Sequence, residues 1–174
     1  LVDITSSRMP AWQQSVKRVF DIAVSAVAIL LLSPVYLYVA VRVKLGSKGP
    51  VFYKQERIGY EGRPFMIYKF RTMYVDAERQ GPQLSQVNDP RITPFGHIMR
   101  KYRLDELPQF WNIIKGDMSI VGPRPERKFY IEQIEKIAPY YCLVYKVKPG
   151  LLSWGPIKIG YSEKEEKMVE RLRY

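Results

Sequence analysis

A hydrophobic segment near the start of the sequence constrains the fold most. Twenty residues from Ile22 to Val41 carry no formal charge, and about that many residues of helix cross the hydrocarbon core of a bilayer. Ser33 and Pro34 interrupt the run, and a proline inside a helix removes a backbone donor and clashes with the preceding turn. Cutting the run there leaves pieces of roughly 12 and 8 residues, each too short to span the core alone.

Basic residues flank this segment at both ends. The flanking cations are Lys17 and Arg18 on one side and Arg42, Lys44 and Lys48 on the other. Positive charge marks the cytoplasmic flank of a membrane segment, so a complete crossing would leave one basic flank on the wrong side. We therefore predict a re-entrant membrane helix over residues 19–44, which enters the bilayer, breaks at Ser33-Pro34 and returns to the same face.

Two other interpretations of the segment stay open. One is an ordinary spanning helix, because the preference for positive charge on the cytoplasmic side is statistical. The other is a helical hairpin buried in the core of a soluble protein. A cleaved signal peptide is not expected, because the run starts well inside the sequence and has no A-x-A-like cleavage site.

The charge balance and the single cysteine restrict the chemistry. Lys and Arg number 28 against 17 Asp and Glu, a net charge of +11, which favours an anionic partner such as nucleic acid, lipid headgroups or phosphorylated small molecules. Cys142 has no second cysteine to pair with and is expected to be a small buried apolar residue. Because His97 is the single histidine, a Cys/His zinc site is excluded, and a metal would need oxygen ligands.

Beyond the hydrophobic segment, the sequence predicts an α+β fold that is mostly helical with a small β-hairpin. Two β-rich runs within residues 51–73 surround a turn from Gly59 to Pro64. The other predicted elements are a helical stretch over 97–116 interrupted at Pro108, a loop over 116–126, a helix over 126–141 and an extended stretch over 145–160.

Asp105 and Glu106 are adjacent carboxylates in a basic stretch of the sequence. Such a pair alone usually marks a solvated helix end. The nearby cations, which change this interpretation, are Lys69, Arg71, Arg100, Arg103, Arg124 and Arg127. Mg²⁺ takes one or two carboxylates and completes its coordination with phosphate and water, so oxygen ligands beside a basic cluster indicate Mg²⁺ and phosphate chemistry. A carboxylate in such a setting can also act as a nucleophile.

The sequence GPRP at residues 122–125 supports the same interpretation. Prolines on both sides of Arg124 restrict its backbone. A guanidinium held in this way is suited to bind a phosphate at a fixed position.

Three stretches of the sequence resemble a known family. The family is that of the bacterial sugar transferases, and more narrowly the monotopic polyprenyl-phosphate phosphoglycosyl transferases. The stretches that resemble it are KFRTM (69–73), RKYRLDELPQFWNIIKGDMSIVGPRP (100–125) and VKPGL (147–151). The hydrophobic segment with Ser33-Pro34 resembles the re-entrant membrane helix of that family. The resemblance extends roughly from Trp12 to Gly160.

The resemblance implies a monotopic enzyme on the cytoplasmic face of the bacterial inner membrane. Such an enzyme moves a sugar 1-phosphate from a UDP-sugar to polyprenyl phosphate, such as undecaprenyl phosphate. The products are polyprenyl diphospho-sugar and UMP, and the reaction initiates the assembly of surface glycans.

The resemblance also implies a role for each acid and cation. Asp105 matches the nucleophile that attacks the β-phosphate and carries the phospho-sugar as a covalent intermediate. Glu106 would help to arrange Mg²⁺ and the Asp105 carboxylate, so both acids are expected at the metal. Arg124 matches the phosphate-holding arginine of the Pro-Arg-Pro loop.

Three further cations complete the implied phosphate-binding set. Arg100 matches an arginine that braces the acids, and Lys69 and Arg71 are the basic residues of the KFRT motif. For these three, structural ion pairing stays an open alternative.

The expected organisation has four parts. These are an interfacial lead-in over 1–18, the re-entrant helix over 19–44, a cytosolic catalytic domain over 45–160, and the start of a C-terminal helix over 161–174. Residues 1–11 resemble the tail of an upstream region, and the C-terminal helix is expected to continue beyond Tyr174. The stretch after VKPG departs from the family pattern, so the sugar is not determined, and a homodimer is left open.

Two other classes of protein remain as alternatives. A nucleic-acid-binding module would also be basic and could stack bases on the 13 tyrosines, but it gives no reason for the interrupted hydrophobic segment or the paired acids. A non-catalytic membrane scaffold would not need Asp105, Glu106 and Arg124. Activity that is lost with EDTA and regained with Mg²⁺ separates the enzyme from both.

Overall fold

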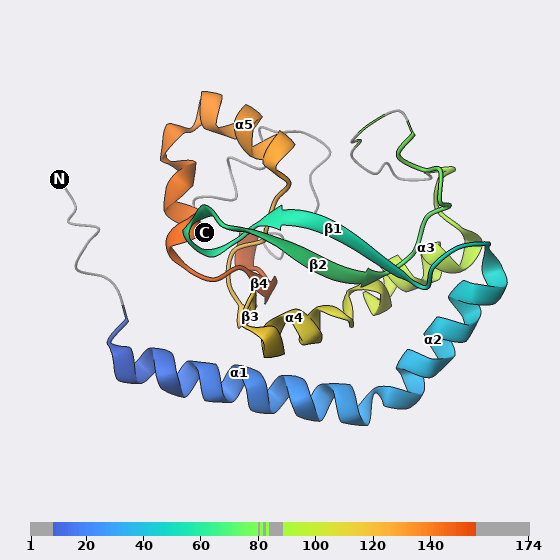
Figure 1. Cartoon of the computed structure of the whole chain (residues 1–174), viewed down its shortest axis with the longest axis horizontal. Helices are drawn as coiled ribbons and strands as arrows, with labels where there is room; N and C mark the ends of the chain where they lie inside the picture. Colours follow the sequence, from blue (N-terminus) through green and yellow to red (C-terminus); the bar gives the residue numbers. More distant parts are fainter. Residues whose placement is uncertain (1–8, 80, 82, 84–88, 156–174) are drawn as a thin grey trace.

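A long bent pair of helices lies along one side of the strands and the shorter helices (Figure 1). The computed structural model describes residues 9–79, 81, 83 and 89–155. Residues 1–8 of the expected lead-in and the expected helix over 161–174 lie outside the described residues. The described part is mostly helical with two small sheets, which confirms the predicted α+β class.

The bent pair consists of α1 (Ala11–Leu31) and α2 (Ser33–Gly46). Pro34 lies in the first turn of α2, where its missing N–H has no helical partner to lose. In a continuous helix it would instead clash with the carbonyl of Leu30, so the helix breaks where the sequence predicts. The two axes are bent by 62°. Within the described residues neither helix alone is long and apolar enough to cross a membrane, whereas the two together meet both requirements.

The predicted hairpin is present. β1 (Phe52–Ile58) and β2 (Pro64–Phe70) pair antiparallel, and the 3₁₀ turn η1 (Tyr60–Gly62) connects them inside the predicted turn region. A two-stranded hairpin is marginally stable alone in water. Here Ile67 and Phe70 of β2 are buried against the helices below it, which supply the packing that it needs.

The remaining elements form the rest of the domain. They are α3 (Pro94–Lys101), the 3₁₀ turn η2 (Leu104–Glu106), α4 (Gln109–Lys115), β3 (Ser119–Val121), α5 (Lys128–Ile137), the 3₁₀ helix η3 (Pro139–Lys146) and β4 (Gly150–Leu152). β3 pairs in parallel with β4. The prediction of a loop throughout 116–126 was therefore wrong, because a three-residue strand is too short to show alternation. The extended stretch starts later than predicted, because η3 continues to Lys146.

Three clusters of buried side chains hold these elements together. The first joins α2 to β2 and α3 through Val39, Val43, Phe70 and Met99. The second joins β2 to α4 through Ile67, Ile113 and Met118. The third joins α5 to η3 through Ile131, Ile134, Ala138 and Tyr141. The first cluster fixes α2 to the domain along its length. Cys142, expected to be buried, is exposed, because η3 packs inward through its neighbour Tyr141 instead.

α1 is attached to the domain by a buried polar contact. Asp21 is 4% exposed and accepts hydrogen bonds from Oγ of Ser119 at 2.8 Å and from the amide of Ile120 at 3.3 Å. Lys17 donates to both Asp21 and Ser119. A buried carboxylate is tolerated only when it is paired and hydrogen-bonded, so this contact fixes α1 against β3.

A second polar contact joins α1 to α4. The Arg18 guanidinium donates to the carbonyls of Ile113 at 2.5 Å and Ile114 at 2.7 Å. These carbonyls lie in the last turn of α4, where a cation is favourable; the carbonyl of Ile113 also accepts from the amide of Gly116 at 3.1 Å. The expected lead-in from Ala11 onward is thus one helix with the hydrophobic segment, and it is bound to the domain.

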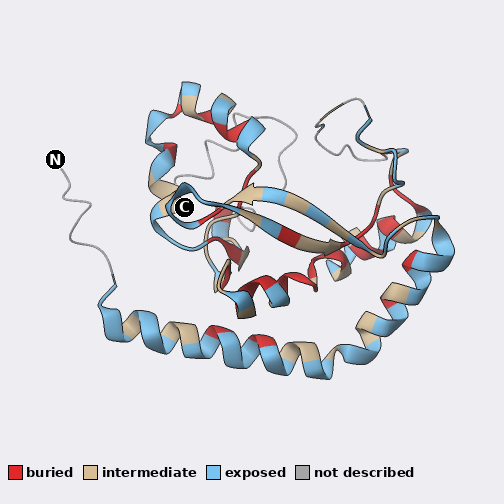
Figure 2. Ribbon diagram, viewed as in Figure 1, coloured by how far each residue is buried: buried red, intermediate tan, exposed pale blue. Residues whose placement is uncertain are grey.

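The outward faces of α1 and α2 are exposed and apolar (Figure 2). Their exposed large side chains include Trp12, Val16, Val19, Phe20, Val27, Leu30 and Leu31 on α1, and Leu37, Tyr38, Val41 and Leu45 on α2. Soluble monomers rarely expose a contiguous apolar surface of this extent. The described structure therefore does not have the hairpin buried in a soluble core that the sequence left open.

Candidate active site

The two acids lie on a short turn between two helices. α3 ends at Lys101, and Arg103 adopts a left-handed conformation with φ of 57°. The 3₁₀ turn η2 then carries Asp105 and Glu106, both more than 90% buried. Sequence periodicity predicted an interruption at Pro108, but the helix breaks earlier, at Arg103, and Pro108 instead precedes the first turn of α4. A left-handed arginine is uncommon, and here it reverses the chain so that the acids face inward.

Glu106 is the centre of a cluster of cations. Its Oε1 lies 3.0 Å from Nζ of Lys69 and 3.6 Å from Nη1 of Arg124, and its Oε2 lies 3.3 Å from Nη1 of Arg103. Burial alone would raise the pKa of Glu106, but the three cations outweigh it and hold the pKa at about 2. Glu106 is therefore a permanent anion that positions Lys69 and Arg124.

Asp105 has a different environment from its neighbour. Its Oδ1 is buried and has no hydrogen-bond partner among the described residues. Burial raises the pKa of Asp105, and the Glu106 charge adds to this, while Lys69 and Arg100 oppose it. A buried polar atom without a partner is rare and needs an explanation. A carboxylate oxygen that no protein group satisfies is available to a ligand or to a reaction.

The structure brings Arg100 into this site and places Arg71 elsewhere. Arg100 interacts electrostatically with Asp105, and its Nε donates to Oγ1 of Thr72 at 3.0 Å. Arg71 donates instead to the carbonyls of Lys48 at 2.6 Å and Ser47 at 2.9 Å. Lys69 and Arg71 would share a face if the strand continued, but β2 ends at Phe70 and Arg71 turns toward α2.

The Pro-Arg-Pro loop is held against β4 by close backbone contacts. The amide of Gly122 donates to the carbonyl of Leu152 at 3.1 Å, and that of Gly150 donates to the carbonyl of Pro123 at 2.9 Å. A Cβ at Gly122 would lie 2.3 Å from the carbonyl oxygen of Lys148. Glycine is therefore required for the approach that brings Arg124 to Glu106.

Sequence reasoning missed Arg57, which holds the other side of this loop. Nη1 of Arg57 donates to the carbonyl of Pro125 at 3.2 Å and to Oε2 of Glu126 at 3.3 Å. The amide of Ile58 donates to the carbonyl of Glu126 at 3.0 Å. The available signal was the pair of polar residues at Gln55 and Arg57, which share one face of β1 and hydrogen-bond to each other.

Asn112 is a second residue that sequence reasoning missed. It is fully buried, its Oδ1 accepts from the amide of Tyr68 at 3.0 Å, and its Nδ2 donates to the carbonyl of Met66 at 2.7 Å. These bonds join α4 to the edge of β2 that β1 leaves open, and so fix the acid turn relative to Lys69. In the sequence, Asn112 could have been recognised as a polar residue among the apolar positions of the predicted helix.

The donor set fits a metal ion held mainly by a substrate. Among the described residues, no group of three or more His, Cys, Asp or Glu side chains comes together to hold a metal. The unpartnered Oδ1 of Asp105 offers one oxygen ligand, and Mg²⁺ commonly takes one or two carboxylates with phosphate and water. Both oxygens of Glu106 already face cations, so its contacts favour a role beside the metal rather than on it.

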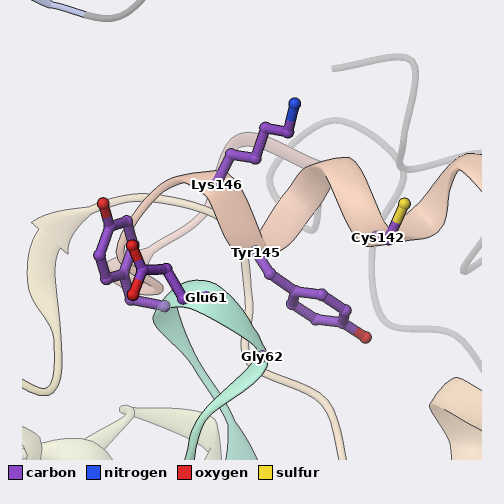
Figure 3. Close-up of a pocket in the computed structure, with 6 residues that line it drawn as sticks. Glu61, Gly62, Cys142, Tyr145 and Lys146 are labelled. Carbon is purple, nitrogen blue, oxygen red and sulfur yellow. The ribbon is translucent and has the colours of Figure 1, made fainter.

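A separate hollow of about 270 Å³ lies at the tip of the hairpin (Figure 3). Its lining residues are Tyr60, Glu61 and Gly62 of η1 and Cys142, Tyr145 and Lys146 of η3. It contains none of the residues that the sequence singled out for the site, so the chemistry described here does not involve it.

Comparisons with known proteins place the chain among relatives of one kind. It is 45% identical over 147 residues to the UDP-N-acetylgalactosamine-undecaprenyl-phosphate N-acetylgalactosaminephosphotransferase of Aeromonas hydrophila, an alignment that covers 84% of this chain and 35% of that protein. It is 42% identical over 160 residues to the UDP-glucose:undecaprenyl-phosphate glucose-1-phosphate transferase of Escherichia coli strain K12, which covers 91% of this chain and 34% of that protein.

A third relative is more similar in length. The chain is 38% identical over 160 residues to the UDP-glucose:undecaprenyl-phosphate glucose-1-phosphate transferase of Caulobacter vibrioides, covering 90% of this chain and 59% of that protein. The chain spans about a third of the length of the Aeromonas and Escherichia relatives. The sequence profile described as bacterial sugar transferase matches residues 12–174. The chain therefore belongs to the bacterial sugar transferase family.

Proposed function

We propose that this chain transfers a sugar 1-phosphate from a UDP-sugar to a polyprenyl phosphate through a covalent intermediate on Asp105. One observation carries the proposal. A buried carboxylate oxygen of Asp105, with no hydrogen-bond partner in the described part of the chain, lies beside an anionic Glu106 that holds Lys69 and Arg124 in place. The names of the relatives, which are undecaprenyl-phosphate sugar-phosphate transferases, support the same pair of substrates.

In the first step, an oxygen of Asp105 attacks the β-phosphorus of the UDP-sugar. A bond forms between that oxygen and phosphorus, and the bond to the oxygen that bridges the two phosphates breaks. UMP leaves with the bridging oxygen, and the phospho-sugar stays on Asp105 as an acyl phosphate. The raised pKa of Asp105 makes its carboxylate a better nucleophile than a well-solvated aspartate.

In the second step, a phosphate oxygen of polyprenyl phosphate attacks the same phosphorus. The acyl phosphate bond breaks, the electron pair returns to the Asp105 carboxylate, and polyprenyl diphospho-sugar is released. Neither step needs an oxidant or a further reactant. Positioning and charge stabilisation supply most of the catalysis in phosphoryl transfer, and Lys69, Arg100 and Arg124 are the groups placed for this.

Asp105 is the residue that would hold Mg²⁺, through Oδ1. The ion would neutralise charge on the diphosphate and on the leaving UMP. Glu106 acts by holding Lys69 and Arg124, whose charges face the substrate phosphates. Arg71 has no part in this mechanism, because its guanidinium braces the turn after α2.

The bent pair is proposed to enter the membrane and return to the same face. α1 contacts the domain through Asp21, and α2 contacts it through Val39 and Val43. Because both helices are attached to one globular domain, both ends of the pair lie on the side of the membrane that holds it. We place that side at the cytoplasmic face, where UDP-sugars are made.

The decisive experiment separates the two steps. The protein is incubated with a panel of UDP-sugars and Mg²⁺ without lipid acceptor, and UMP release and protein mass are followed. The correct sugar should give one equivalent of UMP in a burst and a phospho-sugar adduct on the peptide that contains Asp105. Asp105→Asn should abolish both, whereas the control Asp76→Asn, at an exposed acid, should change neither.

Direct attack by polyprenyl phosphate on the UDP-sugar is the competing mechanism. It requires a ternary complex and forms no adduct, and its double-reciprocal plots intersect. Parallel plots together with a trapped adduct indicate the two-step route. Intersecting plots without an adduct would reduce Asp105 to a metal ligand and refute the covalent proposal.

A further inference from the structure

A cavity of about 330 Å³ lies where α2 ends and α3 begins, apart from the acid turn. The residues that line it are Arg42, Val43, Leu45, Gly46, Ser47, Arg71, Thr93, Pro94 and Phe95. Two arginines line it, and no acidic residue of the described ranges does. Apart from Ser47 and Thr93, its other lining residues are apolar or glycine, so it is a small basic pocket with an apolar rim.

Arg71 is a buried cation without an anionic partner. It is 6% exposed, and among the described residues no carboxylate forms an ion pair with it. Two of its N–H groups bind the carbonyls of Ser47 and Lys48, while its buried Nε has no partner. Burial lowers the pKa of the Arg71 guanidinium, and no nearby acid opposes this. Buried charges are normally paired, so this arginine lacks the counter-ion that its position calls for.

Two further features make the cavity attractive to an anion. Arg42 lies over the ring of Phe95 at 5.0 Å and is also without a carboxylate partner among the described residues. The first turn of α3 lies at the cavity and contains no acid. Pro94 has no N–H and the Gly96 amide already donates to Oγ1 of Thr93, so this turn contributes no repelling carboxylate rather than a strong positive end. Two cationic side chains, and among the described residues no carboxylate, therefore line one cavity.

The cavity continues into the exposed apolar face of α2. Leu45 lines the cavity and is 79% exposed. Val41 and Tyr38 follow along the same side of the helix, at positions one and two turns earlier. Tyr38 also packs edge-to-face on Phe95, with ring centroids 6.2 Å apart. A ligand with its head in the cavity would find an apolar track for its tail along α2.

From this geometry we propose that the cavity binds the phosphate group of an anionic membrane lipid, one whose headgroup carries no compensating cation. The phosphate would lie between Arg71 and Arg42 at the start of α3, and the hydrocarbon chain would follow Leu45, Val41 and Tyr38. Both an anionic phospholipid and a polyprenyl phosphate carry this chemistry. The site is separate from the Asp105 centre and rests only on the membrane location of α2, not on the transfer reaction.

The test measures thermal unfolding of the full chain in detergent, without UDP-sugar. Four compounds are titrated separately: dioctanoyl phosphatidylglycerol, dioctanoyl phosphatidylcholine, farnesyl phosphate and inorganic phosphate. Three variants are compared with the unaltered protein. Arg42→Gln removes one cation, Gly46→Leu reduces the cavity at a helical position where an added Cβ meets no atom within 4 Å, and Lys48→Gln removes an equal charge from a side chain that does not line the cavity.

The unaltered protein and Lys48→Gln should show a saturable rise in Tm with phosphatidylglycerol, since a ligand that binds the folded state stabilises it. Arg42→Gln should need about tenfold more lipid, the effect of losing one charge-assisted hydrogen bond, and Gly46→Leu should lose the response. A rise with farnesyl phosphate that also depends on Arg42 identifies a site that holds a polyprenyl phosphate apart from the Asp105 centre. A rise with phosphatidylglycerol alone identifies it as one for the surrounding phospholipid.

Three results would overturn the proposal. The first is an equal loss in Arg42→Gln and Lys48→Gln, which indicates surface charge rather than a site. The second is an equal response to phosphatidylcholine, which indicates that anionic charge is not recognised. The third is an equal response to inorganic phosphate, which indicates that the lipid chain has no role. Because no sugar nucleotide is present, none of these results bears on the transfer reaction.

Discussion

Replacing Glu106 by glutamine tests how the cation cluster is held together. Glutamine keeps the shape of the side chain and removes its charge. Lys69, Arg103 and Arg124 would then lose the anion that they share. The pKa of Asp105 should fall, because the negative charge of Glu106 that raises it is gone while Lys69, which lowers it, remains.

The pKa of Glu106 sets an upper bound on the loss of stability. The fall from 4.5 to about 2 in the folded state corresponds to roughly 3 kcal/mol at about 1.36 kcal/mol per pH unit. Burial lowers the pKa of Lys69 in the same cluster, so part of this stabilisation is offset by the cost of desolvating the lysine. We therefore expect Glu106→Gln to lower the free energy of unfolding at pH 7 by about 1–3 kcal/mol.

The pH dependence distinguishes this mechanism from a general loss of packing. A carboxyl whose folded pKa is lowered stabilises the protein above its unfolded pKa, and this contribution disappears as the pH falls through the folded value. The wild type should therefore lose stability between pH 4.5 and about 2, and Glu106→Gln should lose less over that window. Thermal unfolding in detergent at a series of pH values measures this.

The matched control for this experiment is Glu132→Gln. Glu132 pairs with Lys128 at 3.9 Å, and both side chains are largely exposed. An exposed pair of this kind contributes little, so the control should behave as the wild type at every pH. If Glu106→Gln kept the full stability at pH 7, or kept the same acid-induced loss as the wild type, the assignment of Glu106 as the shared anion would be refuted.

Three more changes test the supports of the site. Arg57→Lys keeps the charge, but a lysine cannot donate to both the Pro125 carbonyl and Glu126. Burst UMP release should therefore slow by about tenfold. Unchanged kinetics would show that the loop does not need this contact. Asn112→Ala leaves a backbone amide and a carbonyl of β2 unpaired and should lower the free energy of unfolding by about 2–4 kcal/mol, which thermal unfolding in detergent would detect. Asp21→Asn weakens the contact between α1 and β3; amide exchange at Ile120 should become faster, and an unchanged rate would argue against the contact.

The features that the sequence predicted correctly are local ones. The helix break at Pro34 follows from the covalent structure of proline and needs no tertiary contact. The hairpin follows from two β-rich runs separated by a short turn. The position of the acids at a helix boundary was also predictable, although the left-handed Arg103 that creates the boundary was not, because arginine has no intrinsic preference for that conformation.

The features that were missed depend on contacts between distant parts of the chain. β3 and β4 are three residues each and are recognisable only as a pair, with register Ser119 to Gly150. Arg71 was expected at the phosphates because it follows Lys69 in one motif, but the end of β2 between them sends the two side chains to different sites. Arg57 and Asn112 bind partners 68 and 44 residues away, which no local pattern specifies.

The bent pair of helices, which we propose enters the membrane, is bonded directly to both halves of the site. Asp21 of α1 holds β3, whose end continues into the Pro-Arg-Pro loop. Tyr36 of α2 donates to the carbonyl of Leu107, the residue that follows Glu106, at 2.5 Å. A polyprenyl phosphate has its headgroup confined to one depth of the membrane surface, so a protein that uses it must hold its nucleophile at a matching height. The hydrogen bonds that Asp21 accepts and that Tyr36 donates fix Arg124 and Asp105 relative to the bent pair, which gives a reason for inward-facing polar residues on helices whose outer faces are apolar.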